Sequence, residues 1–246
     1  LFFWVARMVM MGIELTGESP FKVVYMHGLV RAADNTKMSK TKGNVVDPID
    51  TVEKFGADSL RYSLVTGVTP GQDIPLNMDK IEANRNFANK LWNCVSFVVN
   101  NALKDVEFNS PEWNSLAPSD TNDIDFSTLP LPEQWILTRC DALIASVTKD
   151  LESYNFGVAG SKIYEFLWED YANWYVEISK TRLYEGLKLD EAAVFDVERA
   201  KMSKKVLVYA IDRVLRVLHP FMPFVTEHLY HHIPRRDPTA SHSLML

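Results

Sequence analysis

The residues best suited to chemistry lie in the ten-residue string NTKMSKTKGN, at positions 35–44. Residues 37–44 of the string hold three lysines, two hydroxyl residues and one glycine: Lys37, Lys40, Lys42, Ser39, Thr41 and Gly43. An ammonium group is a compact charge on a flexible stem, which suits a phosphate chain that moves during a reaction. A glycine lets the backbone bend close to such a ligand. The pattern predicts a phosphate-binding loop, and a solvated basic turn is the alternative that these features leave open.

The letters K-M-S-K occur again at positions 201–204, in a different setting. No glycine or strand-like run precedes this second copy, and it continues directly into a helical apolar pattern. Because lysine and methionine favour helices, we interpret the second copy as a chance match on a helix. Gln72 and Asp73 could be taken for a catalytic pair, but a turn after Pro70 and Gly71 explains them without chemistry.

Two segments precede the loop and would support it. Residues 22–30, KVVYMHGLV, are β-branched and aromatic, which predicts a buried strand that leads into the loop. The N-terminal segment LFFWVARMVMMG is apolar throughout, and we expect a buried helix that ends at Gly12.

Two helices are predicted after the loop. Asp47 is expected to cap the first, with Pro48 at the first helical position and Gly56 as the stop signal. Asp58 is expected to cap the second, which ends at Gly67. The first 80 residues therefore alternate helix, strand and helix, as an α/β unit does.

From about Asn84 onward, apolar residues recur at helical spacing. The third helix, about 158–184, is apolar on two faces, and the fourth ends at His219-Pro220 before a short helix that follows Pro223. Residues 81–246 are thus predicted to form an all-α antiparallel helical bundle, with Trp92, Trp168 and Trp174 in its core. The stripes are Phe87, Leu91, Val95, Val98 and Ala102; Ile136, Cys140, Leu143, Val147 and Leu151; Ile163, Leu167, Trp174 and Ile178, with Tyr164, Trp168, Tyr171 and Tyr175; and Leu207, Ile211, Val214 and Leu218.

Composition excludes some classes of protein. The chain has 246 residues and a formal net charge of −6, but residues 31–42 are locally basic and the connector 105–130 is acidic. No apolar run is long enough to suggest a membrane span. Cys94 and Cys140 stand apart without CxxC or histidine ligand spacing, so neither zinc nor a disulfide is indicated and a reducing compartment is expected.

The stretch HGLV…KMSKTKGNVVDP resembles the KMSKS loop of class I aminoacyl-tRNA synthetases. Four further strings, LFFWVARM, TPGQDI, NFANKLWN and HPFMPFVTEHLY, are similar to the valine-specific branch of that family. The resemblance implies that residues 1–80 are the second half of a Rossmann-like catalytic domain and that residues 81–246 are an α-helical anticodon-binding domain. The implied reaction is activation of valine by ATP, as its Mg²⁺ complex, to valyl-adenylate, followed by transfer to tRNA(Val).

The resemblance also assigns roles to residues of the loop. Lys37 and Lys40 would bind the β- and γ-phosphates and stabilise the departing pyrophosphate. The ATP-binding residues would be Lys37, Met38, Ser39, Lys40, Thr41, His27 and Gly28, with His27 and Gly28 near the adenine. Thr41 departs from the usual serine but keeps the hydroxyl group. Taken without the resemblance, a histidine on an apolar strand is more often a satisfied core residue.

Contacts with tRNA are expected at the end of the third helix. The polar face of that helix carries Glu165, Glu169 and Glu177, which would repel phosphate. Lys180, Arg182 and Lys188 are therefore the predicted tRNA-binding residues. The basic residues at 199–205 form a second candidate patch, equally consistent with a solvated surface.

Some features of the family are missing from these 246 residues. The His-x-Gly-His motif occurs nowhere, and the editing insertion and coiled-coil arm are absent, so we expect the segment alone to be inactive. A monomeric full-length enzyme is expected, in the cytoplasm or in a chloroplast or mitochondrion. Three alternatives stay open: an isoleucine, leucine or methionine synthetase, a non-catalytic tRNA-binding module, and a nucleotide kinase or ATPase. The absence of GxxxxGK[ST] counts against the last of these.

Overall fold

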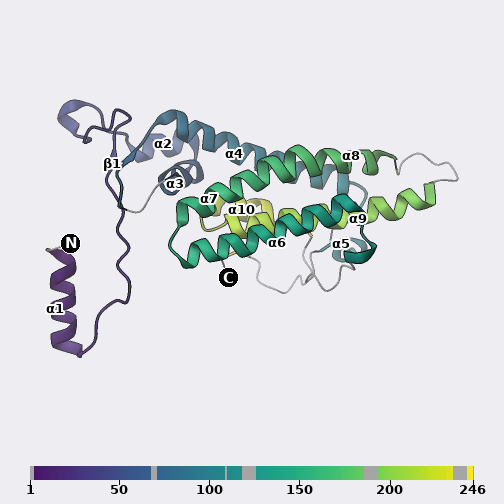
Figure 1. The fold of residues 1–246 in the computed structure, drawn as a ribbon. Helices are drawn as coiled ribbons and strands as arrows, with labels where there is room; N and C mark the ends of the chain where they lie inside the picture. The colour runs from purple at the N-terminus through teal and green to yellow at the C-terminus, as the bar shows by residue number, and fades with distance from the viewer. Residues whose placement is uncertain are drawn as a thin grey trace.

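The computed structural model describes residues 3–67, 71–108, 110–117, 126–185, 193–234 and 243–245. Helices dominate these residues, and two short strands pair in parallel (Figure 1). In chain order the elements are α1 (Trp4–Thr16), β1 (Val30–Arg31), η1 (Lys40–Lys42), α2 (Pro48–Phe55), α3 (Ala57–Val65), β2 (Ile74–Pro75), α4 (Met78–Phe97), η2 (Val98–Ala102), α5 (Pro111–Ser115), η4 (Phe126–Thr128), α6 (Leu131–Glu152), α7 (Phe156–Glu165), η5 (Phe166–Tyr175), α8 (Val176–Glu185), α9 (Ala193–Leu218) and α10 (Pro223–Tyr230).

One large apolar cluster lies between the long helices of residues 78–230. α6 packs against α7, η5 and α9, and α8 packs along α9 (Figure 1). The predicted first and fourth stripes are fully buried in this cluster, and the second is buried except for the partly buried Leu151. α9 ends at Leu218, just before the predicted stop at His219-Pro220, and α10 begins at Pro223. Apolar periodicity therefore located these helices correctly, because each must bury one stripe.

Two tryptophans that were predicted to lie in the core are instead exposed. Trp174 is 61% exposed and Trp92 is 45% exposed, whereas Trp168 packs partly buried against the cluster. Trp174 lies in η5, where the third helix is a π-helix. Each residue of a π-helix turns through a smaller angle than in an α-helix, so a stripe extrapolated at α-helical spacing drifts off the core. Trp92 stacks instead on His228, with ring centroids 5.2 Å apart.

The helix after the lysine loop forms as predicted. The Asp47 carboxylate accepts a hydrogen bond from the Ile49 N–H at 2.8 Å, and Pro48 occupies the first helical position. α2 ends at Phe55, and Gly56 then adopts a φ of 88° that lets the chain turn directly into α3. This pair of helices forms the base on which the loop rests.

Asp58 does not cap α3 as predicted. Gly56 is the N-cap of α3, and the Asp58 carboxylate accepts hydrogen bonds from the N–H groups of Phe224 at 3.2 Å and Val225 at 2.7 Å. These donors belong to the first turn of α10, where N–H groups have no partner within the helix. The buried Asp58 therefore caps a helix far along the chain and ties α3 to α10.

The predicted strand at 22–30 is wrong in extent and in burial. Only Val30–Arg31 is a strand, and it pairs in parallel with Ile74–Pro75. Side chains before it are exposed, including Val24 at 45% and Met26 at 50%. A strand forms by pairing with a neighbour, and among the described residues the pairing partner is the two-residue β2.

The N-terminal helix also differs from its prediction. α1 continues through Gly12 to Thr16, and the left-handed Gly17, with a φ of 77°, ends it. None of its residues is buried, and it stands apart from the other helices (Figure 1). An apolar sequence shows that a helix has a face to cover, but the described part of the chain does not cover this one.

A compact junction joins the loop-bearing helices to the long helices. The Tyr62 hydroxyl of α3 donates to the Gly160 carbonyl of α7 at 2.8 Å, and the Tyr62 ring stacks on Phe87 of α4. A Cβ on Gly160 would lie 2.5 Å from the Thr66 side chain, so the two helices approach as closely as a glycine allows. This junction fixes α3 and, through it, the base of the lysine loop.

Candidate functional site

The lysine loop begins with a tight turn directly after β1. The Ala32 N–H donates to the Thr36 carbonyl at 3.0 Å, and the Asn35 N–H donates to the Ala32 carbonyl at 2.8 Å. Asn35 takes a left-handed φ of 62°, a conformation that asparagine tolerates better than most residues. The chain thus reverses direction immediately before the first lysine.

Met38 anchors the middle of the loop. Its side chain is partly buried and packs against a small apolar cluster of Phe55, Leu76 and Ile81. These residues belong to α2, to the segment after β2, and to α4, so three parts of the chain pack against one side chain. The methionine between the lysines therefore points inward and holds the loop to the fold.

The second half of the loop closes on itself as the 3-10 turn η1. The Ser39 hydroxyl oxygen accepts from the Lys42 N–H at 3.3 Å, and it lies 2.9 Å from the Thr41 hydroxyl oxygen. Gly43 ends the turn with a left-handed φ of 65°. The two hydroxyl residues and the glycine therefore shape the loop in this structure.

Lys37, Lys40 and Lys42 are all exposed. Within the described residues none of the three forms an ion pair, and the nearby Asp34 accepts its two hydrogen bonds from Thr36. Two hydrogen bonds from Thr36, first from its hydroxyl and then from its backbone, lower the pKa of Asp34. Three ammonium groups thus project from one short segment, which produces a local positive field suited to an anion.

His27 and Gly28 lie just before β1. The His27 ring is exposed, with Nδ1 2.8 Å from the Gly28 carbonyl oxygen, so it is not the satisfied core histidine of the alternative prediction. Gly28 is buried, and a Cβ there would lie 1.9 Å from the Gln72 carbonyl oxygen. The backbone just before β1 can therefore lie against the backbone just before β2 only because residue 28 has no side chain.

Gln72 and Asp73 lie where these two backbone segments come close together. Asp73 accepts from the Leu29 N–H at 2.9 Å and forms an ion pair with Arg31. The Leu29 N–H, followed by the Arg31 guanidinium, lowers the pKa of the Asp73 carboxyl. Asp73 thus holds β1 in register with β2, in keeping with its exclusion from the candidate catalytic residues.

Two of the predicted tRNA-binding residues, Lys180 and Arg182, lie in the part of the chain that the structure describes, and each has a carboxylate partner. Lys180 pairs with Glu177 at 2.5 Å and lies over the Phe97 ring. Arg182 turns inward, with 18% of its side chain exposed, and pairs with the fully buried carboxylate of Glu133. Lys188 lies outside the described residues. Neither composition nor spacing revealed that Arg182 would find a buried partner 49 positions earlier.

The second K-M-S-K string lies within α9, as interpreted from the sequence. Its Ser203 is fully buried and donates to the Glu133 carboxylate at 2.7 Å. Identical letters therefore have different environments: Ser39 shapes an exposed loop, and Ser203 satisfies a buried acid.

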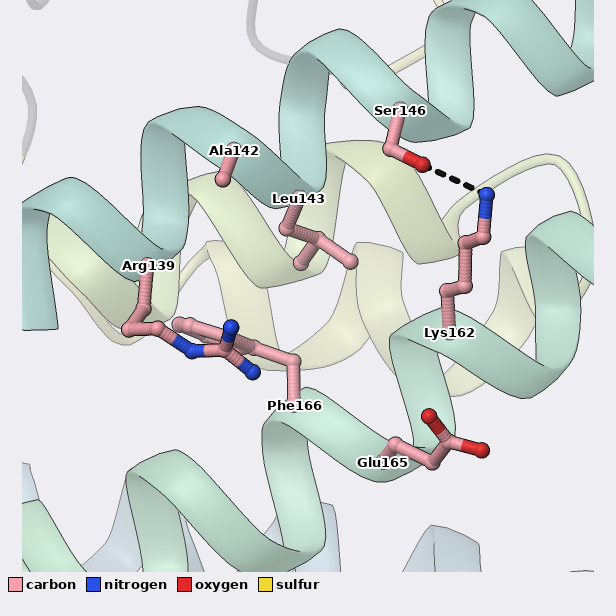
Figure 2. A pocket seen from close by; sticks show the side chains of 7 residues that line it. All are labelled: Arg139, Ala142, Leu143, Ser146, Lys162, Glu165 and Phe166. Carbon is pink, nitrogen blue, oxygen red and sulfur yellow. Dashed lines mark hydrogen bonds between the residues drawn. The ribbon is translucent and has the colours of Figure 1, made fainter.

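A surface pocket between α6 and the α7–η5 helix was not anticipated. Its volume is about 260 Å³, and Figure 2 shows Arg139 and Lys162 at its two ends. Lys162 pairs with Asp150 at 2.5 Å and also donates to Ser146, and Arg139 pairs with Asp170 at 2.8 Å. Because Arg139 and Lys162 each have a carboxylate partner and Glu165 adds a negative charge to the lining, the pocket is poorly suited to a phosphate.

The part of the chain that the structure describes contains neither a metal-binding group of side chains nor a membrane-spanning helix. No group of three or more histidine, cysteine, aspartate or glutamate side chains lies close enough together to hold a metal ion. None of the helices there is long and apolar enough to cross a membrane.

Comparisons with known families match most of the chain. Residues 1–77 match the family described as tRNA synthetases class I (I, L, M and V). Residues 133–246 match the anticodon-binding domain of tRNA ligase. The first match contains the lysine loop, and the second contains the helices from α6 to α10.

Curated relatives match the chain nearly end to end. It is 44% identical over 242 residues to a valine--tRNA ligase of Bacillus thuringiensis subsp. konkukian, covering 98% of this chain and 25% of that protein. It is 45% identical over 236 residues to the Arabidopsis thaliana valine--tRNA ligase, chloroplastic/mitochondrial 2, covering 96% and 23%. The chain thus spans about a quarter of the length of the curated relatives it matches.

Solved structures share the fold at lower identity. Mycobacterium tuberculosis methionyl-tRNA synthetase in complex with methionyl-adenylate matches with a TM-score of 0.66 and 23% identity, over 82% of this chain and 36% of that one. The Agrobacterium radiobacter K84 agnB2 LeuRS in its ternary LeuRS-tRNA-LeuAMS complex matches with a TM-score of 0.62 and 22% identity, over 91% and 24%. From its two family matches and its relatives, the chain belongs to the class I aminoacyl-tRNA synthetases and is homologous to their valine--tRNA ligases.

Proposed function

We propose that this chain is a segment of a valine--tRNA ligase, which activates valine with ATP and transfers it to tRNA(Val). The observation that carries the proposal is the lysine loop, held by Met38 with its ammonium groups exposed and unpaired among the described residues, in a chain homologous to such ligases. In this proposal residues 1–80 are the C-terminal part of a Rossmann-like catalytic domain. Residues 81–246 form the helical anticodon-binding domain, with 105–130 as its acidic connector.

Lys37 and Lys40 are the proposed catalytic residues. As the α-phosphate of ATP is attacked, negative charge builds up on the departing pyrophosphate. An ammonium group that meets this charge more closely in the transition state than in the ground state accelerates the reaction. The exposure of both lysines on a flexible stem supports this role, since their ammonium groups can follow the leaving group.

The other loop residues have supporting roles in the proposal. Met38 anchors the loop, and Ser39 and Thr41 shape its turn and face ATP with their hydroxyl groups. His27 and Gly28 lie just before β1, ahead of the loop, and would be near the adenine of ATP. ATP would enter as its Mg²⁺ complex, with the ion held by the nucleotide.

The proposal extends to partners and compartment. tRNA(Val) would contact the helical domain, with Lys180 and Lys188 as candidate phosphate contacts, while the inward position of Arg182 favours a structural role for that residue. A monomeric enzyme is proposed, in the cytoplasm or in an organelle, because the relatives include bacterial and plant organellar proteins.

The test uses the full-length polypeptide and measures valine-dependent exchange of labelled pyrophosphate into ATP. Lys40→Ala should lower the exchange by about 100-fold or more, the usual effect of removing one group that stabilises developing charge. Lys149→Ala, an exposed lysine on α6, is the matched control and should leave exchange unchanged. Unfolding of the Lys40→Ala variant should match that of the parent, because the side chain is exposed.

Parallel assays separate the competing functions. Exchange that depends on isoleucine, leucine or methionine would assign another member of the family. A non-catalytic tRNA-binding module would bind tRNA with a salt-dependent affinity and show no exchange. Full exchange in the Lys40→Ala variant would overturn the proposed role of the loop.

A further inference from the structure

The side-chain amide of Asn44 bridges the lysine loop from its far end. Its Oδ1 accepts from the Ser39 N–H at 2.9 Å, and its Nδ2 donates to the Lys37 carbonyl at 3.3 Å and to the Thr36 hydroxyl oxygen at 3.1 Å. A backbone N–H can only donate and a carbonyl can only accept, so the two backbone partners fix the orientation of the amide. One side chain therefore bonds to three residues of the loop, Thr36, Lys37 and Ser39.

The third bond agrees with this orientation. The Thr36 hydroxyl donates its proton to the Asp34 carboxylate at 2.7 Å, which leaves an oxygen lone pair to accept from Asn44. Asp34 also accepts from the Thr36 N–H at 3.0 Å. The chain of bonds from Asp34 through Thr36 to Asn44 thus links the turn before the lysines to the residue after them.

Few other hydrogen bonds restrain the backbone from Lys37 to Ser39. Within the described residues, no other group bonds to the Ser39 N–H or to the Lys37 carbonyl. Met38 between them is anchored through its side chain, and η1 is closed by the Lys42 N–H, which donates to the Ser39 carbonyl at 3.1 Å, on the far side of Ser39 from Lys37. The backbone orientation of Lys37, and the angle at which η1 with Lys40 follows it, therefore depend on the amide of Asn44.

We propose that Asn44 is a positioning residue that sets the loop shape from which Lys37 and Lys40 reach the departing pyrophosphate. This inference rests on the proposed function of the loop. Asn44 touches the backbone of the loop, and its effect reaches the reaction through the two lysines. Its loss should therefore impair the chemical step more than the binding of ATP.

The test measures pyrophosphate exchange in the full-length polypeptide with Asn44→Ala, Lys40→Ala and the double variant. Asn44→Ala should lower kcat by about tenfold to 100-fold, and change the KM for ATP by less than about threefold. In the Lys40→Ala background, Asn44→Ala should lower the remaining kcat by a smaller factor than it does in the parent, because only Lys37 is then left to be positioned. Asn86→Ala, an exposed asparagine on α4, is the control and should match the parent.

Each other outcome counts against a specific part of the argument. If Lys40→Ala abolishes exchange and Asn44→Ala does not lower it, the positioning role is refuted and the proposed function stands. If both variants keep full exchange, the proposed catalytic role of the lysine loop fails and the inference fails with it; absence of valine-dependent exchange in the parent polypeptide would refute the proposed function. Fully multiplicative losses in the double variant would show that Asn44 acts independently of Lys40 and would overturn the inference. Should Asn44→Ala not fold, Thr36→Val removes one of the three bonds and should still lower kcat by a smaller factor.

Discussion

Arg182→Ala should destabilise the helical part of the chain, although the sequence suggested a surface role for this arginine. Glu133, at the start of α6, is fully buried, and its carboxylate has three partners. They are the Arg182 guanidinium, the Ser203 hydroxyl at 2.7 Å and the Tyr175 hydroxyl at 3.5 Å. These groups come from α6, α8, α9 and η5, so a single acid joins four helical segments.

The size of the effect follows from what the substitution leaves behind. Without Arg182, the buried carboxylate keeps only two neutral donors, one of them at the long distance of 3.5 Å. Removing one partner of a buried ion pair costs about 3–5 kcal/mol. Because 18% of the arginine side chain is exposed, water can partly replace it, and we expect about 3 kcal/mol. With a typical slope for urea unfolding, the midpoint should fall by about 1–2 M.

The assay is urea-induced unfolding followed by far-ultraviolet circular dichroism near neutral pH. Lys180→Ala is the matched control on the same helix, since its pair with Glu177 is half-exposed and should contribute less than about 1 kcal/mol. Glu133→Gln added to Arg182→Ala removes the buried charge and should restore most of the loss. If the stability of Arg182→Ala lies within about 1 kcal/mol of the parent, as for loss of an exposed arginine, the pair with Glu133 does not stabilise the fold as argued from its burial.

Two further predictions concern the strand crossing and the cysteines. Gly28→Ala places a Cβ 1.9 Å from the Gln72 carbonyl oxygen, so β1 and β2 should separate. The amide hydrogen of Ile74, which donates to the Leu29 carbonyl, should then exchange with solvent at least about tenfold faster. An unchanged rate of hydrogen exchange would contradict this. Burial raises the pKa of Cys94 to about 11 and of Cys140 to about 12 from the ordinary 9.0, so iodoacetamide near neutral pH should alkylate them only after unfolding. Above about pH 9 the unfolded thiols release protons and the folded ones do not, so the free energy of unfolding should decline as the pH rises beyond that point. Alkylation of the native chain at the rate of a free thiol would disprove both statements.

Features that depend on neighbouring residues were predicted well. Asp47 and Pro48 place the start of α2 because a carboxylate can reach the next N–H groups of its own helix. Pro223 marks the start of α10, and His219-Pro220 follows directly on the end of α9, for the same local reason. The shape of the lysine loop was also predictable in outline, since a glycine and hydroxyl residues between lysines favour a bent, exposed segment.

Features that depend on distant partners were predicted poorly. Asp58 has the local features of a cap for α3, but its carboxylate finds free N–H groups on α10. Arg182 pairs with Glu133, a partner 49 positions away that its local sequence does not indicate. The apolar run 22–30 seemed to be a buried strand, but the described residues pair only its end.

Local sequence is enough to predict most of the helical segments, the apolar stripes of the long helices, and the grouping of three lysines with a glycine and two hydroxyl residues. These properties follow from backbone hydrogen bonding and side-chain periodicity, which act over a few residues. The tertiary structure alone decided which charges are paired, which strand has a partner, and that Asn44 spans the loop. Such contacts depend on the relative positions of residues far apart in the chain or on both sides of a turn, and no local spacing encodes those positions.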